Sequence, residues 1–160
     1  MKNKTFVALI AFFLVAAGAA AVYAESAHVG SFNFDVPNDF KVKETNDTTV
    51  VLQNDKKEII ITSKIVGKDA VNSYLSGQGF KFNETINGTK DVKGTGLNGH
   101  YSYTADTFSK DKGYAIAYLL TDKNVSVIAI DNDFNSDDNF DSSDLSNAVG
   151  GIVDKIMLSK

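Results

Sequence analysis

The most continuous apolar pattern lies between Gly113 and Asp131, where two apolar runs flank a short polar turn. In both runs, residues 114–120 and 125–130, successive positions are apolar on both faces of an extended chain. A strand with one wet face alternates between apolar and polar residues, so this pattern predicts inner strands covered on both sides. The turn at residues 121–124 makes the strands antiparallel neighbours, and we expect their hairpin in the middle of a sheet.

Other extended segments surround this hairpin. The first, residues 31–37, turns Phe32, Phe34 and Val36 inward and stops at Pro37, which has no N–H to donate to a neighbouring strand. Further strands are predicted at residues 41–44, 49–53, 58–66, 80–86, 90–95 and 99–108. Residues 54–57 form a tight turn that joins two of them as a hairpin.

Two helices are predicted. The first covers residues 69–76, with Asp69 as its N-terminal cap and Gly77 at its end. The second covers residues 143–157, with Asp141 or Ser142 as its cap. Its apolar residues keep a helical spacing throughout: Leu145, Ala148, Val149, Ile152, Val153, Ile156 and Met157.

These elements predict an α+β fold in which helices cover an antiparallel β-sheet, an α/β/α sandwich. The order resembles the PsbP-like family in three features: the strand–proline–phenylalanine opening of residues 32–40, the helix after a hairpin, and the closing strand and helix of residues 125–157. The resemblance covers most of residues 30–158 and lies in topology. It implies a fold and an accessory, non-catalytic character, and it supplies no site residues.

The N-terminal 24 residues have the pattern of an export signal. Lys2 and Lys4 precede an apolar core, and an alanine-rich tail ends at Ala24 before Glu25. The alternative is an uncleaved membrane anchor, since residues 5–24 carry no charge and are about long enough to span a bilayer. Both alternatives predict a protein that is secreted or held on the extracytoplasmic face of the membrane. Residues 25–29 are then a short linker, and residues 30–160 a single domain.

Composition excludes several classes of protein. The chain has no cysteine, so disulfides, cysteine metal sites and thiol nucleophiles are absent. All 16 basic residues are lysine, and the formal net charge is −4. Loss of residues 1–24 removes two lysines, which gives 14 − 20 = −6. An acidic chain without arginine argues against a nucleic-acid partner.

The acidic segment after the central hairpin contains a candidate calcium site. Asp131, Asp133, Asn135 and Asp137 place oxygen ligands at alternate positions, as in the first half of a calcium loop. The loop lacks the glycine and the bidentate glutamate of that motif, since Ser136 and Ser142 stand in their places, so a site here is expected to be weak. The alternative is a solvated acidic loop that caps the last helix. No other cofactor is expected.

Four acceptor sequences for N-glycosylation follow the predicted leader, at Asn46, Asn83, Asn87 and Asn124. Most lie near predicted turns, and Asn83 lies inside a predicted strand. An asparagine- and threonine-rich composition also produces such matches by chance.

Two other patterns are interpreted as parts of the fold and not as functional sites. The glycines of residues 94–99 match G-x-G-x-x-G, but a strand pattern follows them instead of the helix that a dinucleotide site needs. His28 lies in the linker. His100 shares a strand face with Ser102 and Asp106, where parallel neighbouring side chains are poorly aimed for proton transfer.

The sequence therefore predicts an exported binding or accessory domain without catalytic activity. Its partner is an unidentified envelope protein or a small ligand, and it meets the membrane only through residues 5–24 if these are retained. One alternative is a calcium-dependent cell-surface module that uses residues 131–141. The other is an extracellular hydrolase whose site has no recognisable motif.

Overall fold

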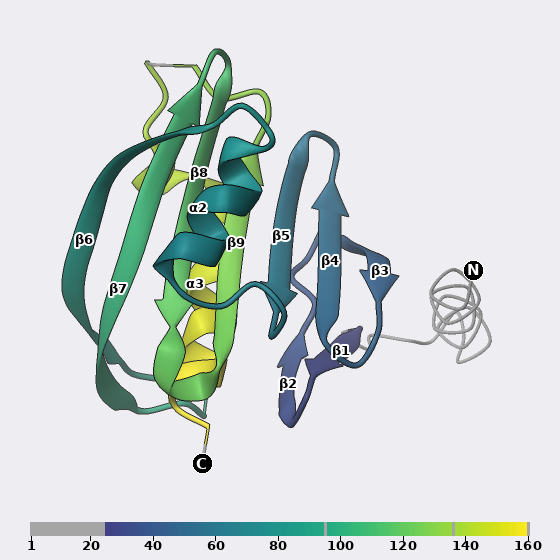
Figure 1. Cartoon of the computed structure of the whole chain (residues 1–160). Coiled ribbons are helices and arrows are strands. Elements are labelled where there is room, and N and C mark those ends of the chain that lie inside the picture. The colour runs from purple at the N-terminus through teal and green to yellow at the C-terminus, as the bar shows by residue number, and fades with distance from the viewer. Residues whose placement is uncertain (1–24, 95, 136, 160) are drawn as a thin grey trace.

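The computed structural model describes residues 25–94, 96–135 and 137–159, and Figure 1 shows their arrangement. The predicted leader or anchor lies outside the described residues. The elements are β1 (Ser26–Val29), β2 (Phe32–Asp35), β3 (Lys41–Thr45), β4 (Thr49–Asn54), β5 (Lys57–Thr62), α2 (Lys68–Ser76), β6 (Lys81–Val92), β7 (Gly99–Lys110), β8 (Gly113–Leu120), the 3-10 turn η1 (Thr121–Lys123), β9 (Val125–Asp131), the 3-10 turn η2 (Phe140–Ser142) and α3 (Asp144–Met157). No helix within these ranges has both the length and the apolar character needed to span a bilayer.

The fold is α+β, with antiparallel pairing between all neighbouring strands described. The main sheet has seven strands in the order β3-β4-β5-β9-β8-β7-β6, and β1 and β2 form a separate two-stranded hairpin. The predicted central hairpin is confirmed, because β9 is the middle strand and β8 lies next to it. Every residue of β9 is buried, as a strand covered on both faces requires.

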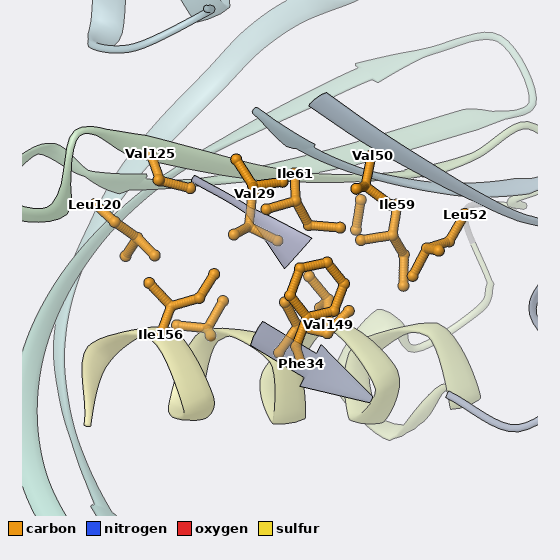
Figure 2. Close-up of a cluster of buried hydrophobic side chains, with 14 of the residues drawn as sticks. Val29, Phe34, Val50, Leu52, Ile59, Ile61, Leu120, Val125, Val149 and Ile156 are labelled. Carbon is orange, nitrogen blue, oxygen red and sulfur yellow. The ribbon is translucent and has the colours of Figure 1, made fainter. Parts of the chain in front are cut away.

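Two apolar cores lie on opposite faces of this sheet. On one face, α3 and the β1–β2 hairpin pack over side chains such as Ile61 and Val125, as Figure 2 shows. On the other face, Val71 and Leu75 of α2 pack against Ile60 and Ile128. The helices lie on opposite faces because the strands between them carry apolar side chains both above and below the sheet (Figure 1).

The structure corrects four predictions about local structure. The expected linker at residues 25–29 contains strand β1, whose Ala27 and Val29 join the core. The two strands predicted at residues 80–86 and 90–95 are one strand, β6, which pairs with β7 throughout and whose exposed residues show little apolar alternation. Gly67 occupies the N-cap position of α2, and the Ser143 hydroxyl caps α3 by accepting from the N–H of Ser146 at 3.1 Å.

The strands β6 and β7 extend beyond β8, the neighbour of β7 in the sheet. β7 pairs with β8 from Lys110 only as far as Ala105, which lies opposite Tyr118, whereas its pairing with β6 continues to Gly99. The two strands therefore form a ribbon whose far half has no β8 beside it. This change from three strands to two creates the candidate site.

Candidate functional site

A hollow of ≈ 480 Å³ lies where the β6–β7 ribbon separates from β8, and we call it the Tyr103 hollow. The ribbon lines one side of it, and the end of β8 with η1 lines the other. Its lining residues are Asn87, Gly88, Thr89, Ser102, Tyr103, Thr104, Leu119, Leu120, Thr121, Asp122 and Met157. Its volume falls within the range of small-molecule binding sites, about 300–1,000 Å³.

Four polar side chains of the ribbon form two directly opposed pairs in this hollow. Asn87 lies opposite Thr104, and Thr89 lies opposite Ser102. The Thr104 hydroxyl donates to the Asn87 Oδ1 at 2.8 Å, which fixes the orientation of the amide. Hydroxyl and amide groups both donate and accept hydrogen bonds, so the four side chains present a mixed array to a ligand.

Tyr103 lines the hollow from the other face of the ribbon, where the residue opposite it has no side chain. Gly88 is its cross-strand partner, and a Cβ atom at Gly88 would lie 2.6 Å from the Tyr103 hydroxyl oxygen. The ring also packs against Tyr118, with centroids 5.6 Å apart. Burial, with a smaller contribution from the Tyr103 phenol, raises the pKa of Tyr118 to about 12. The Tyr118 phenol is therefore a neutral hydrogen-bonding group near neutral pH.

A partly buried polar network holds the ribbon to α3. The Lys90 ammonium lies 2.8 Å from the Asp154 Oδ1, and the Tyr101 hydroxyl donates to the same oxygen at 2.5 Å. Burial, followed by this hydrogen bond, raises the pKa of Tyr101. Because Lys90 and Tyr101 come from the two strands of the ribbon and Asp154 from the helix, the network sets the position of the ribbon.

A second polar group lies under α2. The Asp106 side chain is 1% exposed, and its Oδ1 accepts a 2.7 Å hydrogen bond from the Thr85 hydroxyl. The Lys68 ammonium lies 3.6 Å from Oδ2, and it donates to Thr85 at 2.8 Å. Asp106 is six residues from His100 along β7, roughly 20 Å at the rise of an extended chain. The structure therefore does not bring together the His100, Ser102 and Asp106 set of the sequence analysis.

His100 has a different partner. Its Nδ1 lies 2.6 Å from the Asp91 Oδ1 on the neighbouring strand, and both side chains are largely exposed. His28 lies on β1 with its side chain exposed. In the glycine-rich segment, the Leu97 N–H donates to the Gly94 C=O at 3.1 Å, and β7 begins at Gly99, so a turn and a strand stand here as predicted.

The predicted calcium ligands are divided between two hollows. Asp131 and Asp133 line one that also contains Lys56, and Asn135 and Asp137 line another. The Asp131 Oδ1 accepts from the N–H of Asp133 at 2.9 Å, and the Asp133 carboxylate lies 3.7 Å from the Lys56 ammonium. In the described part of the chain, no three His, Cys, Asp or Glu side chains are grouped to hold a metal. The calcium site stays a prediction from the sequence.

The acidic loop is anchored by aromatic residues that the sequence reasoning did not use. The rings of Phe134 and Phe140 lie 5.0 Å and 4.8 Å from that of Tyr114 on β8. Burial raises the pKa of Tyr114, and the nearby Asp141 carboxylate adds to the rise. The available signal was the presence of two phenylalanines in an otherwise polar segment, since such side chains are seldom left in water.

The four predicted glycosylation asparagines lie in different environments. Asn83, Asn87 and Asn124 are exposed. Asn46 is partly buried, and its Oδ1 accepts from the N–H groups of Thr48 and Thr49 at 2.9 and 3.0 Å. Glycosylation at these positions stays a prediction from the sequence.

Comparisons with protein-family models, with curated proteins and with solved structures give no match for this chain. The resemblance to the PsbP-like family stays a prediction based on the order of the elements.

Proposed function

We propose that this chain is an exported, non-catalytic binding or accessory domain, and that the Tyr103 hollow takes a neutral ligand rich in hydroxyl groups, such as a saccharide. The observation that carries this proposal is the presence of two opposed polar pairs, Asn87 with Thr104 and Thr89 with Ser102, on one face of the ribbon that lines the hollow. These groups both donate and accept, which suits the hydroxyl groups of a sugar. Tyr103 lies between these pairs in the register, so its ring is on the opposite face of the ribbon, where it packs against Tyr118.

The charge of the hollow favours a neutral ligand. Among its lining residues, Asp122 supplies the one carboxylate, and no lysine is present. An anionic ligand would gain no ion pair there, and a cation would meet a single exposed carboxylate, which is worth little in water. Recognition would therefore depend on hydrogen bonds to the four polar side chains.

Two further parts of the proposal concern location and family. The charged start, apolar core and alanine-rich tail of residues 1–24 support export. Helices packed on opposite faces of an antiparallel sheet support the PsbP-like α/β/α sandwich, and through it an accessory role. Cell fractionation with mass spectrometry tests export: a chain starting at Glu25 indicates cleavage, an intact chain in membranes indicates an anchor, and recovery from the cytoplasm contradicts export.

Calorimetric titration with neutral hexasaccharides of glucose and of N-acetylglucosamine tests the ligand. Saturable binding to at least one probe is expected, and Thr104→Val is expected to weaken it about tenfold, the effect of a lost hydrogen bond worth roughly 1.4 kcal/mol. Ser31→Ala, an exposed hydroxyl in the turn between β1 and β2, is the matched control for Ser102→Ala. If Ser102→Ala binds the hexasaccharides as tightly as Ser31→Ala does, or if no probe binds, the proposal of a saccharide ligand is wrong.

A further inference from the structure

The outer edge of β6 is a second surface, which shares Asn87 and Thr89 with the proposed ligand site. β6 ends the seven-stranded sheet and pairs with β7 on one side. Among the described residues, no strand pairs with its other side, and most of its twelve residues are exposed. A free edge of this length presents a row of backbone N–H and C=O groups that another strand can pair with.

The opposite edge of the sheet, β3, has features that hinder pairing with another strand, and most of β6 lacks them. β3 is a five-residue strand with a bulge between Val42 and Glu44, and Lys41 and Lys43 are both exposed. Short length, a bulge and lysines all discourage pairing between strand edges. β6 has its bulge near one end, between Phe82 and Glu84, and pairs regularly with β7 from Glu84 onward.

The regular part of β6 is complementary to itself. If Asn87 lies opposite Asn87 of a second copy, antiparallel pairing places Glu84 opposite Lys90, and Thr85 opposite Thr89, each contact occurring twice. Residues an even number apart lie on the same face of a strand, so each pair meets on one side of the joined sheets. Opposite charges and paired threonines are among the contacts that stabilise neighbouring strands.

The ends of this segment are available for such contacts. The Glu84 side chain is exposed, and the Lys90 side chain is 40% exposed although its ammonium already contacts Asp154. An ammonium group has three hydrogen-bond donors, so it can contact Asp154 and a second carboxylate together.

We infer that two copies of this chain associate through the outer edges of β6, antiparallel and with Asn87 on the two-fold axis. The two sheets then form one continuous sheet. A glycan on Asn87 would occupy this axis, so the association requires Asn87 to be unmodified.

Cysteine crosslinking tests the register, because the chain contains no cysteine of its own. Asn87→Cys places two Cα atoms about 4.5–5.5 Å apart across the axis, within the range of a disulfide. Thr89→Cys, an exposed position on the same strand face, is the matched control: its two copies lie four residues apart along the strands, roughly 14 Å, which a disulfide cannot bridge.

With unglycosylated full-length protein under mild oxidation, Asn87→Cys is expected to shift from 17.3 kDa to 2 × 17.3 = 34.6 kDa on a non-reducing gel. Thr89→Cys is expected to stay at the lower mass. Equal crosslinking of the two variants, or crosslinking of Thr89→Cys alone, would overturn the register.

A charge exchange tests the same contact without crosslinking. Glu84→Lys and Lys90→Glu each place like charges opposite each other, so each variant alone is expected to lose the dimer in analytical ultracentrifugation. Mixed in equal amounts they restore both ion pairs, and a heterodimer is expected. Circular dichroism checks that each variant is folded. A wild-type chain that is monomeric throughout the measured concentrations, or a dimer unaffected by Glu84→Lys, would overturn the inference.

Discussion

Thr85→Val tests how the buried Asp106 carboxylate is stabilised. Valine keeps the branched shape of threonine and removes the hydroxyl that donates to the Asp106 Oδ1 at 2.7 Å. A hydrogen bond to a charged group contributes about 1.5–3 kcal/mol, and losing it leaves a buried acceptor without that donor. Thr85 is itself exposed, so water can replace part of the interaction. We therefore expect the free energy of unfolding to fall by about 1–2 kcal/mol.

Lys68→Met examines the other partner of the same carboxylate. The Lys68 ammonium lies 3.6 Å from the Asp106 Oδ2, with 52% of the lysine side chain exposed. Solvent screening limits such a pair to about 1 kcal/mol. Because the ammonium also donates to the Thr85 hydroxyl, the two substitutions are expected to be non-additive by at least ~0.5 kcal/mol.

Urea denaturation followed by circular dichroism measures these changes, provided that the slope of stability against urea stays constant. Thr89→Val is the matched control, since it lies on the same strand and face and belongs to the same proposed intersubunit pair. It is expected to change stability by less than about 0.5 kcal/mol. If Thr85→Val and Thr89→Val have the same stability, the Thr85 hydroxyl does not stabilise Asp106, and the reasoning is wrong.

Three further measurements test the site and the loop. In an alkaline ultraviolet titration, Tyr118 is expected to ionise near pH 12. Its pKa in the folded state is raised above the ordinary value of about 10, so its contribution to stability is full below pH ~10 and is lost as the pH rises through 12. Tyr118→Phe should remove this loss of stability. Gly88→Ala is expected to lower the free energy of unfolding in urea by about 1–3 kcal/mol, because its Cβ would lie 2.6 Å from the Tyr103 hydroxyl oxygen. Gly151→Ala in α3 should raise it by about 0.5–1 kcal/mol, because no atom lies within 4 Å of the added Cβ. Equal effects of the two substitutions would contradict this packing. Thermal melts with increasing calcium test the predicted calcium site: a melting temperature that rises with calcium supports binding by the loop, and an unchanged melting temperature contradicts it.

The sequence alone determined the centre of the fold. The apolar runs that became β8 and β9 identified the inner hairpin, because a strand buried on both faces must be apolar at successive positions. The helical spacing of residues 145–157 predicted α3 equally well, since a 14-residue helix with an apolar stripe has few alternatives. These features depend on local periodicity, which a sequence displays directly.

The edge of the sheet was decided by tertiary structure. β6 was predicted as two strands because its exposed residues give little alternation, and its continuity comes from pairing with β7 along its whole length. The Tyr103 hollow exists because β7 is longer than its neighbour β8. The residues of neither strand indicate this difference in length. Burial leaves a periodic signal along one segment, whereas the relative lengths of neighbouring strands depend on residues far apart in the chain.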